Sequence, residues 1–247
     1  MALAALGTTQ QDADAAGSAP RQRNRINGSG MPQRNLFPSG VRLANLRGMQ
    51  GSSNGGSRVA IIRHGRSSHV HSGWITASGF HAWRKAYEEA GIREDECVPS
   101  HVAQLLDRAG VVLCSDAPRA VASARLLVSG QDIIISPLLR ELELKCPGLG
   151  GLRLPLAAWA VAVGVRTMLL AMGGRYPSPS DAARVEGAAT LINQVAAQHS
   201  QIIVVTHASF RRLLCKRLAQ AGWRDDSVRR SVRHWSAWLF TQSAELE

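Results

Sequence analysis

The chain has 247 residues, of which 45% are hydrophobic and 19% are charged, a balance that is typical of a globular protein and excludes a fully disordered chain. Its four cysteines form no CxxC pair and no close cysteine–histidine quartet, which argues against a zinc module or a disulfide scaffold and favours a reducing compartment. The formal net charge of +11 favours anionic partners without identifying one.

Residues 1–57 differ in composition from the rest of the chain. They are rich in Ala, Gly, Ser, Asn, Gln and Arg, show no sustained apolar period, and hold six Arg against two Asp. We therefore predict a disordered basic tail over residues 1–57 and a folded domain over residues 58–247. A basic arm that contacts nucleic acid or a membrane surface is the alternative. No aromatic-interleaved or helix-turn-helix pattern supports nucleic-acid binding, so we do not expect a nucleic-acid partner.

Short β-branched runs alternate with segments of helical apolar spacing over the rest of the chain. In chain order, the sequence predicts a strand over 58–62, helices over 80–90 and 102–109, a strand over 111–114, a helix over 118–128 and a strand over 133–135. It then predicts a helix that starts near Pro155, a helix over 181–199, a strand over 201–206, a helix over 210–221 and an edge strand over 235–241. The helix over 118–128 is expected to be capped by Ser115 or Asp116, and the helix over 210–221 to carry a solvated basic face (Arg211, Arg212, Lys216, Arg217). The alternation predicts an α/β fold, a three-layer sandwich with a mostly parallel central sheet flanked by helices.

The segment from Leu154 to Met172 is apolar except for Arg166 and Thr167, and it is long enough to span a bilayer. A mid-helix arginine costs about 2.5–3.5 kcal/mol on insertion, however, and the stretch is rich in Ala rather than Leu. We therefore expect a buried or cleft-lining helix and no membrane partner. The opening residues MALAALG are too few and too uncharged for a signal peptide, and we expect a cytoplasmic protein.

Polar, chemically capable residues follow three of the predicted strands. The first strand runs into Arg63-His64-Gly65, the second into a segment from Ser115 to Arg119, and the fourth into Thr206-His207. Ligand sites in open α/β sheets lie at the carboxyl ends of the strands, so these side chains are expected to converge on one pocket. Arginine forks bind phosphate oxygens and neutral imidazole is a nucleophile, so this composition suits a phosphoryl group.

Four segments in this order resemble the motifs of the histidine phosphatase superfamily, the phosphoglycerate mutase-like group. Ile61-Ile-Arg63-His64-Gly65 with Ser67 is similar to the family's signature, and Cys114-Ser115-Asp116-Ala117-Pro118-Arg119-Ala120 is similar to its second-arginine motif. Leu139-Arg140-Glu141 resembles the segment with the acidic catalytic residue, and Val204-Val205-Thr206-His207 resembles the strand that delivers the second histidine. The resemblance runs from residue 58 to about residue 240 and implies a phosphoglycerate mutase-like fold.

The resemblance implies a role for each matching residue. His64 would be the nucleophile that becomes phosphorylated, while Arg63, Arg119 and His207 would hold the phosphoryl oxygens. Glu141 would protonate the leaving group and then help to activate water, although Glu143 would share its face in an extended segment. The implied activity is hydrolysis of a small phosphorylated substrate through a phosphohistidine intermediate, with no metal and no cofactor.

The chain departs from the family pattern at positions that shape the pocket. Ser68-His69-Val70-His71 stands where many relatives have Asn, Ala208 stands where many have Gly after the second histidine, and Ser180-Asp181 stands where many have a Ser-Glu pair. Arg66, His69 and His71 are candidates for supporting contacts. The insertion over the site, residues 142–179, is mostly apolar, which favours a phosphatase over a mutase. A mutase-like phosphotransferase and a weakly active phosphate-binding protein remain alternatives, and the oligomeric state is open.

Overall fold

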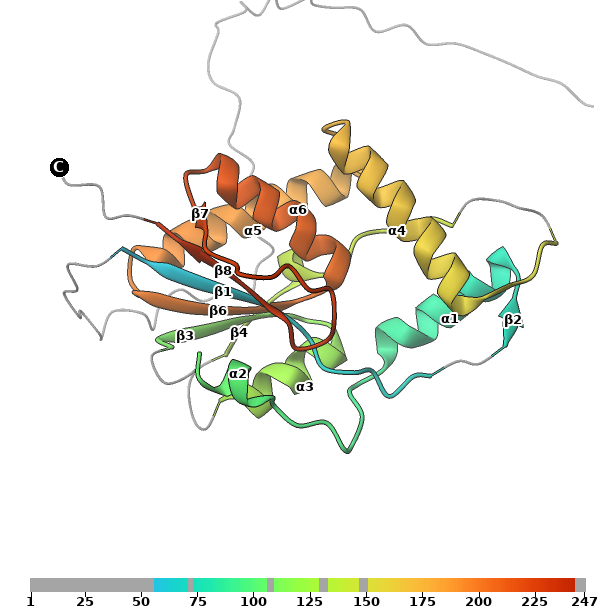
Figure 1. Cartoon of the computed structure of the whole chain (residues 1–247), viewed down its shortest axis with the longest axis horizontal. Helices are drawn as coiled ribbons and strands as arrows, with labels where there is room; N and C mark the ends of the chain where they lie inside the picture. Colours follow the sequence, from blue (N-terminus) through green and yellow to red (C-terminus); the bar gives the residue numbers. More distant parts are fainter. Residues whose placement is uncertain (1–55, 71–72, 106–108, 129–132, 147–150, 243–247) are drawn as a thin grey trace, which may run out of the picture. The chain divides into compact units, whose positions relative to one another are not determined.

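The computed structural model describes residues 56–70, 73–105, 109–128, 133–146 and 151–242. The predicted tail lies outside this part of the chain except for residues 56 and 57, and so does His71. The described residues form a six-stranded sheet with the order β4-β3-β6-β1-β8-β7, together with a separate two-stranded sheet of β2 and β5 (Figure 1).

Four strands predicted from their apolar runs form the parallel part of the sheet, with β4 at its edge. They are β1 (Arg58–Arg63), β3 (Val111–Ser115), β4 (Ile133–Ser136) and β6 (Gln201–Thr206). β6 pairs in parallel with both β1 and β3, and β3 pairs in parallel with β4. Strands covered on both faces require continuous β-branched runs, which is what these segments contain. The pairing brings the carboxyl ends of β1, β3 and β6 side by side.

The last predicted strand is present but its place in the sheet was predicted wrongly. β8 (Ala237–Thr241) is not an edge strand, because it pairs antiparallel with β1 on one side and with β7 (Arg224–Asp225) on the other. β7 has only two residues, too few for a periodic signal in the sequence. A very short strand at the edge limits the backbone available for pairing with another chain.

Helices cover both faces of the sheet, which confirms the predicted three-layer α/β sandwich. Ile61, Leu113 and Val204 pack in one buried cluster with α5 (Pro179–Ala196) and α6 (Ala208–Gln220). The neighbouring strand residues Ile62 and Val205 pack in a second cluster with α2 (Ser100–Ala103) and α3 (Pro118–Leu127). The alternation follows from the two-residue period of a strand, and Figure 1 shows α5 and α6 on one side of the sheet and α2 and α3 on the other.

Several helix boundaries differ from the sequence prediction. α3 is capped by Ala117 without a side-chain bond, because the Ser115 hydroxyl accepts the N–H of Ala117 (3.2 Å) instead. α2 ends at Ala103, and residues 106–108 of the predicted helix lie outside the described residues. α5 starts at Pro179, two residues before the prediction, because the Ser178 hydroxyl accepts the N–H of Asp181 (3.1 Å) as an N-cap.

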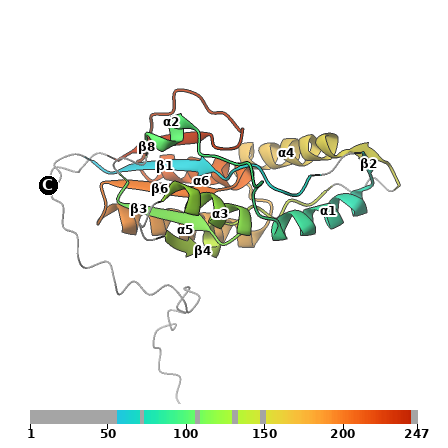
Figure 2. The same cartoon turned by 90° about the horizontal axis from the view of Figure 1, so that it is seen from below.

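A smaller layer lies beyond the carboxyl ends of the sheet strands. It consists of α1 (Ala77–Glu89), α4 (Leu156–Met172), β2 (Trp74–Ile75) and β5 (Leu154–Pro155), with a core of Phe80, Trp159 and Val163 (Figure 2). The indole N–H of Trp159 donates to the Ile75 carbonyl (2.8 Å), which fixes α4 to β2.

The segment 154–172, predicted as a buried or cleft-lining helix, forms α4, which is buried on one side only. Trp159, Val163 and Thr167 are buried, whereas Val161, Val165, Met168, Leu169 and Met172 are exposed. Among the helices that the structure describes, none combines the length and the apolar composition needed to cross a bilayer.

Candidate active site

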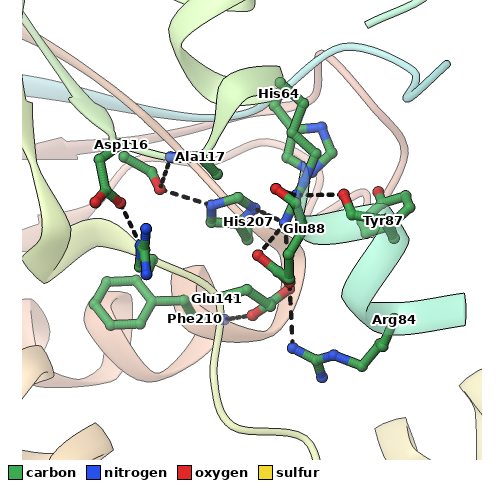
Figure 3. A network of polar contacts seen from close by, with 12 residues as sticks. His64, Arg84, Tyr87, Glu88, Asp116, Ala117, Glu141, His207 and Phe210 are labelled. Atoms are coloured by element: carbon green, nitrogen blue, oxygen red, sulfur yellow. Dashed lines mark hydrogen bonds and ion pairs between the residues drawn. The ribbon is translucent and has the colours of Figure 1, made fainter. Parts of the chain in front are cut away.

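The carboxyl ends of β1, β3 and β6 bring three of the expected side chains into contact. His64 follows β1, Arg119 lies in the first turn of α3 after β3, and His207 follows β6. All three are almost fully buried, with exposed fractions of 2%, 0% and 1%. Figure 3 shows the two imidazoles close together above the carboxylates of Glu88 and Glu141. The ring centroids of His64 and His207 are 5.0 Å apart.

The hydrogen bonds of His64 define which ring nitrogen carries a proton. Nε of Arg119, which can only donate, lies 3.3 Å from Nε2 of His64. Nε2 is therefore the unprotonated nitrogen, and Nδ1–H donates to the Gly65 carbonyl (2.7 Å). The arrangement leaves a lone pair on Nε2, directed at the guanidinium of Arg119. A neutral imidazole held in this tautomer is a nucleophile.

Gly65 is required by close packing beside His64. A Cβ at this position would lie 2.9 Å from Cγ of Glu96 and 3.0 Å from Cζ2 of Trp235. The N–H of Gly65 donates to the Ser123 hydroxyl (2.8 Å), which in turn donates to the Arg119 carbonyl (2.7 Å). These bonds tie the His64 turn to the first turn of α3, so the two functional side chains share one rigid support.

The guanidinium of Arg119 connects both histidines to the last turn of α1. Its Nη2 lies 3.2 Å from Nδ1 of His207 and within 3.3 Å of both carboxylate oxygens of Glu88. Its Nη1 donates to the Tyr87 carbonyl (2.9 Å), and its Cζ lies 4.4 Å from the centroid of the Tyr87 ring. A buried cation with this many fixed partners is well placed to bind an anion.

The hydrogen bonds of His207 also define a single tautomer. Nδ1 accepts from Arg119, so Nε2 carries the proton and donates to the Ser115 hydroxyl (2.9 Å). His207 is the N-cap residue of α6, and its carbonyl accepts the N–H of Arg211 (3.0 Å). The imidazole is thus held between β3, α3 and the start of α6.

Both catalytic candidates are neutral at pH 7 because of their surroundings. Burial, reinforced by the charges of Arg119 and Arg63, holds the pKa of His64 well below its ordinary value. Burial also holds the pKa of His207 well below its ordinary value, with His64 and Arg119 acting in the same direction. A third imidazole, His234, lies 5.5 Å from His64 between ring centroids, and burial is the main cause that lowers its pKa to about 4.

Arg63 is near this cluster, but its guanidinium forms no hydrogen bond with either imidazole. Its Nη1 donates to the Val232 carbonyl (2.5 Å), and its Nε has no hydrogen-bond partner among the described residues. Its charge nevertheless lowers the pKa of both His64 and His207. The structure therefore places Arg63 beside the site, with a buried Nε–H that has no partner among the described residues.

The carboxylate of Glu141 lies at the start of α6, next to His207. Its Oε1 accepts the N–H groups of Phe210 (2.8 Å) and Leu142 (3.0 Å), and its Oε2 accepts the N–H of Ser209 (3.3 Å) (Figure 3). These three bonds hold the carboxyl group of Glu141 against the first turn of α6. The alternative, Glu143, is exposed and accepts from the Ser180 hydroxyl (3.2 Å).

Sequence reasoning missed the residues that α1 contributes to the site. The carboxylate of Glu88 forms ion pairs with Arg119 (3.2 Å) and Arg84 (3.4 Å), and its side chain is 37% exposed. Tyr87 stacks on Trp83 with ring centroids 4.9 Å apart. The sequence signalled only an amphipathic helix here, because charged residues on a helix are usually solvated.

The residues near His64 that were candidates for supporting contacts have other partners. Arg66 pairs with the buried carboxylate of Glu96 (2.7 Å), and the ring of His69 lies 5.9 Å from that of Trp83. Among the described residues, no group of three or more His, Cys, Asp or Glu side chains is placed to hold a metal ion.

No family model matches the sequence, and no curated protein matches it. Among similar solved structures is mycobacterial hydrolase 2, with 19% sequence identity and a TM-score of 0.46 over 67% of this chain and 73% of that chain. The mycobacterial glucosyl-3-phosphoglycerate phosphatase has 19% identity and a TM-score of 0.44 over 66% of this chain and 80% of its own. The phosphoserine phosphatase of Entamoeba histolytica has 10% identity and a TM-score of 0.43 over 66% of this chain and 80% of its own. At these identities the likeness concerns the fold alone. The described residues have the architecture expected from the sequence, an α/β sandwich around a mostly parallel sheet.

Proposed function

We propose that this chain is a phosphomonoester hydrolase that works through a phosphohistidine at His64. The observation that carries the proposal is the fixed tautomer of His64, whose unprotonated Nε2 faces the guanidinium of Arg119. The same guanidinium also bonds to His207, so a phosphoryl group attacked by Nε2 would meet a cation that is already held in place. Phosphoryl transfer needs little beyond such positioning and charge stabilisation.

The reaction proceeds in two in-line displacements. First, the Nε2 lone pair of His64 attacks phosphorus, the P–O ester bond breaks, and the leaving oxygen takes a proton from a carboxylic acid. Then water attacks the phosphohistidine, the N–P bond breaks, and the carboxylate accepts the proton from the water. Inorganic phosphate leaves and the neutral imidazole is restored.

Substrate binding requires a change of partner at Arg119. The Glu88 carboxylate bonds to Nη2, so a substrate phosphoryl group would replace it as the anion at this nitrogen. Arg63, whose Nε is unpaired, would supply a further donor. His207, neutral and bonded to Ser115, would keep Arg119 oriented while the anion exchanges.

Hydrolysis of simple phosphomonoesters tests the function directly. The full chain is incubated with a panel of aryl, sugar and nucleoside monophosphates, with and without a metal chelator, and released phosphate is measured. We expect turnover of at least one ester and no loss of rate with the chelator. If no ester is hydrolysed and vanadate does not bind, the proposal is contradicted.

A weakly active phosphate-binding protein is the second candidate. It is favoured by the ion pair of Arg119 with Glu88, because the anion-binding guanidinium already has a carboxylate partner. Phosphate or vanadate binding without turnover on the same panel would identify this function instead.

The proton donor is expected to be Glu141, and leaving-group dependence tests it. Glu141→Gln should lower kcat/KM, which reports the first displacement, by about 10²–10³-fold for an alkyl phosphate but by much less for p-nitrophenyl phosphate, because a nitrophenolate needs no proton to leave. Steady-state kinetics on both esters measures this. Glu143→Gln, two residues away and exposed, is the matched control. If Glu88→Gln shows this pattern and Glu141→Gln does not, the assignment to Glu141 is wrong.

A further inference from the structure

The exposed side of α4 carries an unusually continuous apolar stripe. Its members recur at helical spacing, and their exposed fractions range from 47% to 74%: Val161, Val165, Met168, Leu169 and Met172. The buried residues Trp159, Val163 and Thr167 lie on the opposite side of the helix. A helix that is apolar on both sides is normally covered on both sides, so the stripe is suited to contact something outside the described chain.

Cationic side chains flank the stripe on both sides. On the α6 side, a hollow of about 420 Å³ is lined by Met168 and Met172 together with Arg212 and Lys216. On the other side, a hollow of about 560 Å³ is lined by Val165 and Leu169 together with Arg166 and Arg175. These four basic residues are exposed, and neither hollow has an Asp or Glu among its described lining residues.

The C-terminal loop extends this surface. Val232 lines the hollow beside Met168, and Val228 nearby in the chain is 96% exposed. Arg229 and Arg233 are also exposed, so the loop repeats the combination of apolar and cationic side chains found on α4. Figure 1 shows α4 and α6 as neighbouring helices, with the loop that precedes β8 close to the start of α6.

We propose that the apolar stripe of α4, with its flanking arginines and lysine, docks on an anionic lipid surface. An interfacial helix buries its apolar side at the acyl boundary while cations on either side contact lipid phosphates and carboxylates, which is the pattern present here. A second copy of the chain fits less well, because its stripe would bring the same cations together. The inference reverses the expectation, drawn from the sequence, that the chain has no membrane partner, and it does not depend on the proposed hydrolysis.

Vesicle sedimentation with the full chain tests the docking surface. We expect binding to vesicles of phosphatidylcholine with phosphatidylserine, little binding to phosphatidylcholine alone, and weaker binding as salt is raised. Leu169→Asp with Met172→Asp should weaken binding at least about tenfold, because it places charge in the apolar stripe. Arg212→Gln with Lys216→Gln should weaken it about thirtyfold, since each basic residue near an anionic surface contributes about fivefold.

Leu126→Asp is the matched control, because Leu126 is 46% exposed on α3, against the opposite face of the sheet. It should leave vesicle binding unchanged. The arginine-rich segment 1–57 is retained in every variant, so any vesicle binding that it causes is the same in all of them. Equal vesicle binding by the wild type and both variants would overturn the proposal. Circular dichroism checks that the variants fold. A wild-type dimer that Leu169→Asp with Met172→Asp converts to a monomer, without loss of vesicle binding, would assign the stripe to self-association and also overturn it.

Discussion

Replacing His64 by alanine is expected to lower phosphatase turnover by about 10³-fold or more. The substitution removes the attacking Nε2 while Arg119 and His207 remain, so substrate binding should fall much less than kcat. Steady-state kinetics on the best ester of the panel measures the effect. Added imidazole should restore part of the rate, because a free imidazole fits the space left by the side chain and supplies the same nucleophile.

The control for this substitution is another histidine. His81→Ala removes an exposed imidazole on α1, and it should leave both kcat and KM unchanged. The melting temperature of His64→Ala separates chemistry from unfolding. A folded His64→Ala protein that retains the wild-type rate would contradict the assignment of the nucleophile.

Replacing Arg211 by methionine is expected to cost about 3 kcal/mol of unfolding free energy. The Arg211 side chain is fully buried and donates to the carbonyls of Ile61, Ser231 and Ser236. Its Cζ also lies 4.2 Å from the centroid of the Trp238 ring. Methionine fills similar volume but removes these charge-assisted bonds, at about 1.5–3 kcal/mol each before the relief of burying a charge is subtracted. The carbonyls of Ser231 and Ser236 keep other donors, so the expected net loss stays near the lower end of the sum.

Thermal and urea unfolding measure the loss, which corresponds to a fall in Tm of about 10 °C for a domain of this size. Burial lowers the pKa of Arg211 to about 10, so the guanidinium is still charged at pH 7. Arg212→Met, on the exposed side of the same helix turn, is the control and should change stability by less than about 0.5 kcal/mol. Equal stability of both variants would show that the Arg211 bonds only offset the cost of its burial.

Arg211 also shows where sequence reasoning about this fold stops. The run from Arg211 to Arg217 predicts a solvated basic face, yet Arg211 lies under the C-terminal loop and is fully buried. Helical spacing identifies which residues share a face, but it does not reveal that a loop some twenty residues later covers that face. By contrast, the runs that form β1 and β6 are apolar between their first and last residues, and strands covered on both faces leave a signal that is local in sequence.

The candidate site likewise contains residues that the sequence predicts and residues that it does not. His64, Arg119 and His207 were predictable because each follows a recognisable buried strand, and the carboxyl ends of neighbouring parallel strands must meet. Glu88 was not predictable, because its contact with Arg119 depends on how the last turn of α1 packs over the sheet. The exposed stripe of α4 was misjudged because composition alone does not say which side of an apolar helix is covered.

Trapping of the phosphorylated protein tests the central claim most directly. The full chain is mixed briefly with a phosphomonoester that it hydrolyses, and the reaction is quenched in alkali. The protein is then digested for mass spectrometry under conditions that preserve phosphohistidine. The account predicts one phosphoryl group on His64, stable in alkali and lost in acid, and no phosphoryl group in His64→Ala. A phosphoryl group on another residue, or turnover with no phosphorylated protein at any time point, would contradict it.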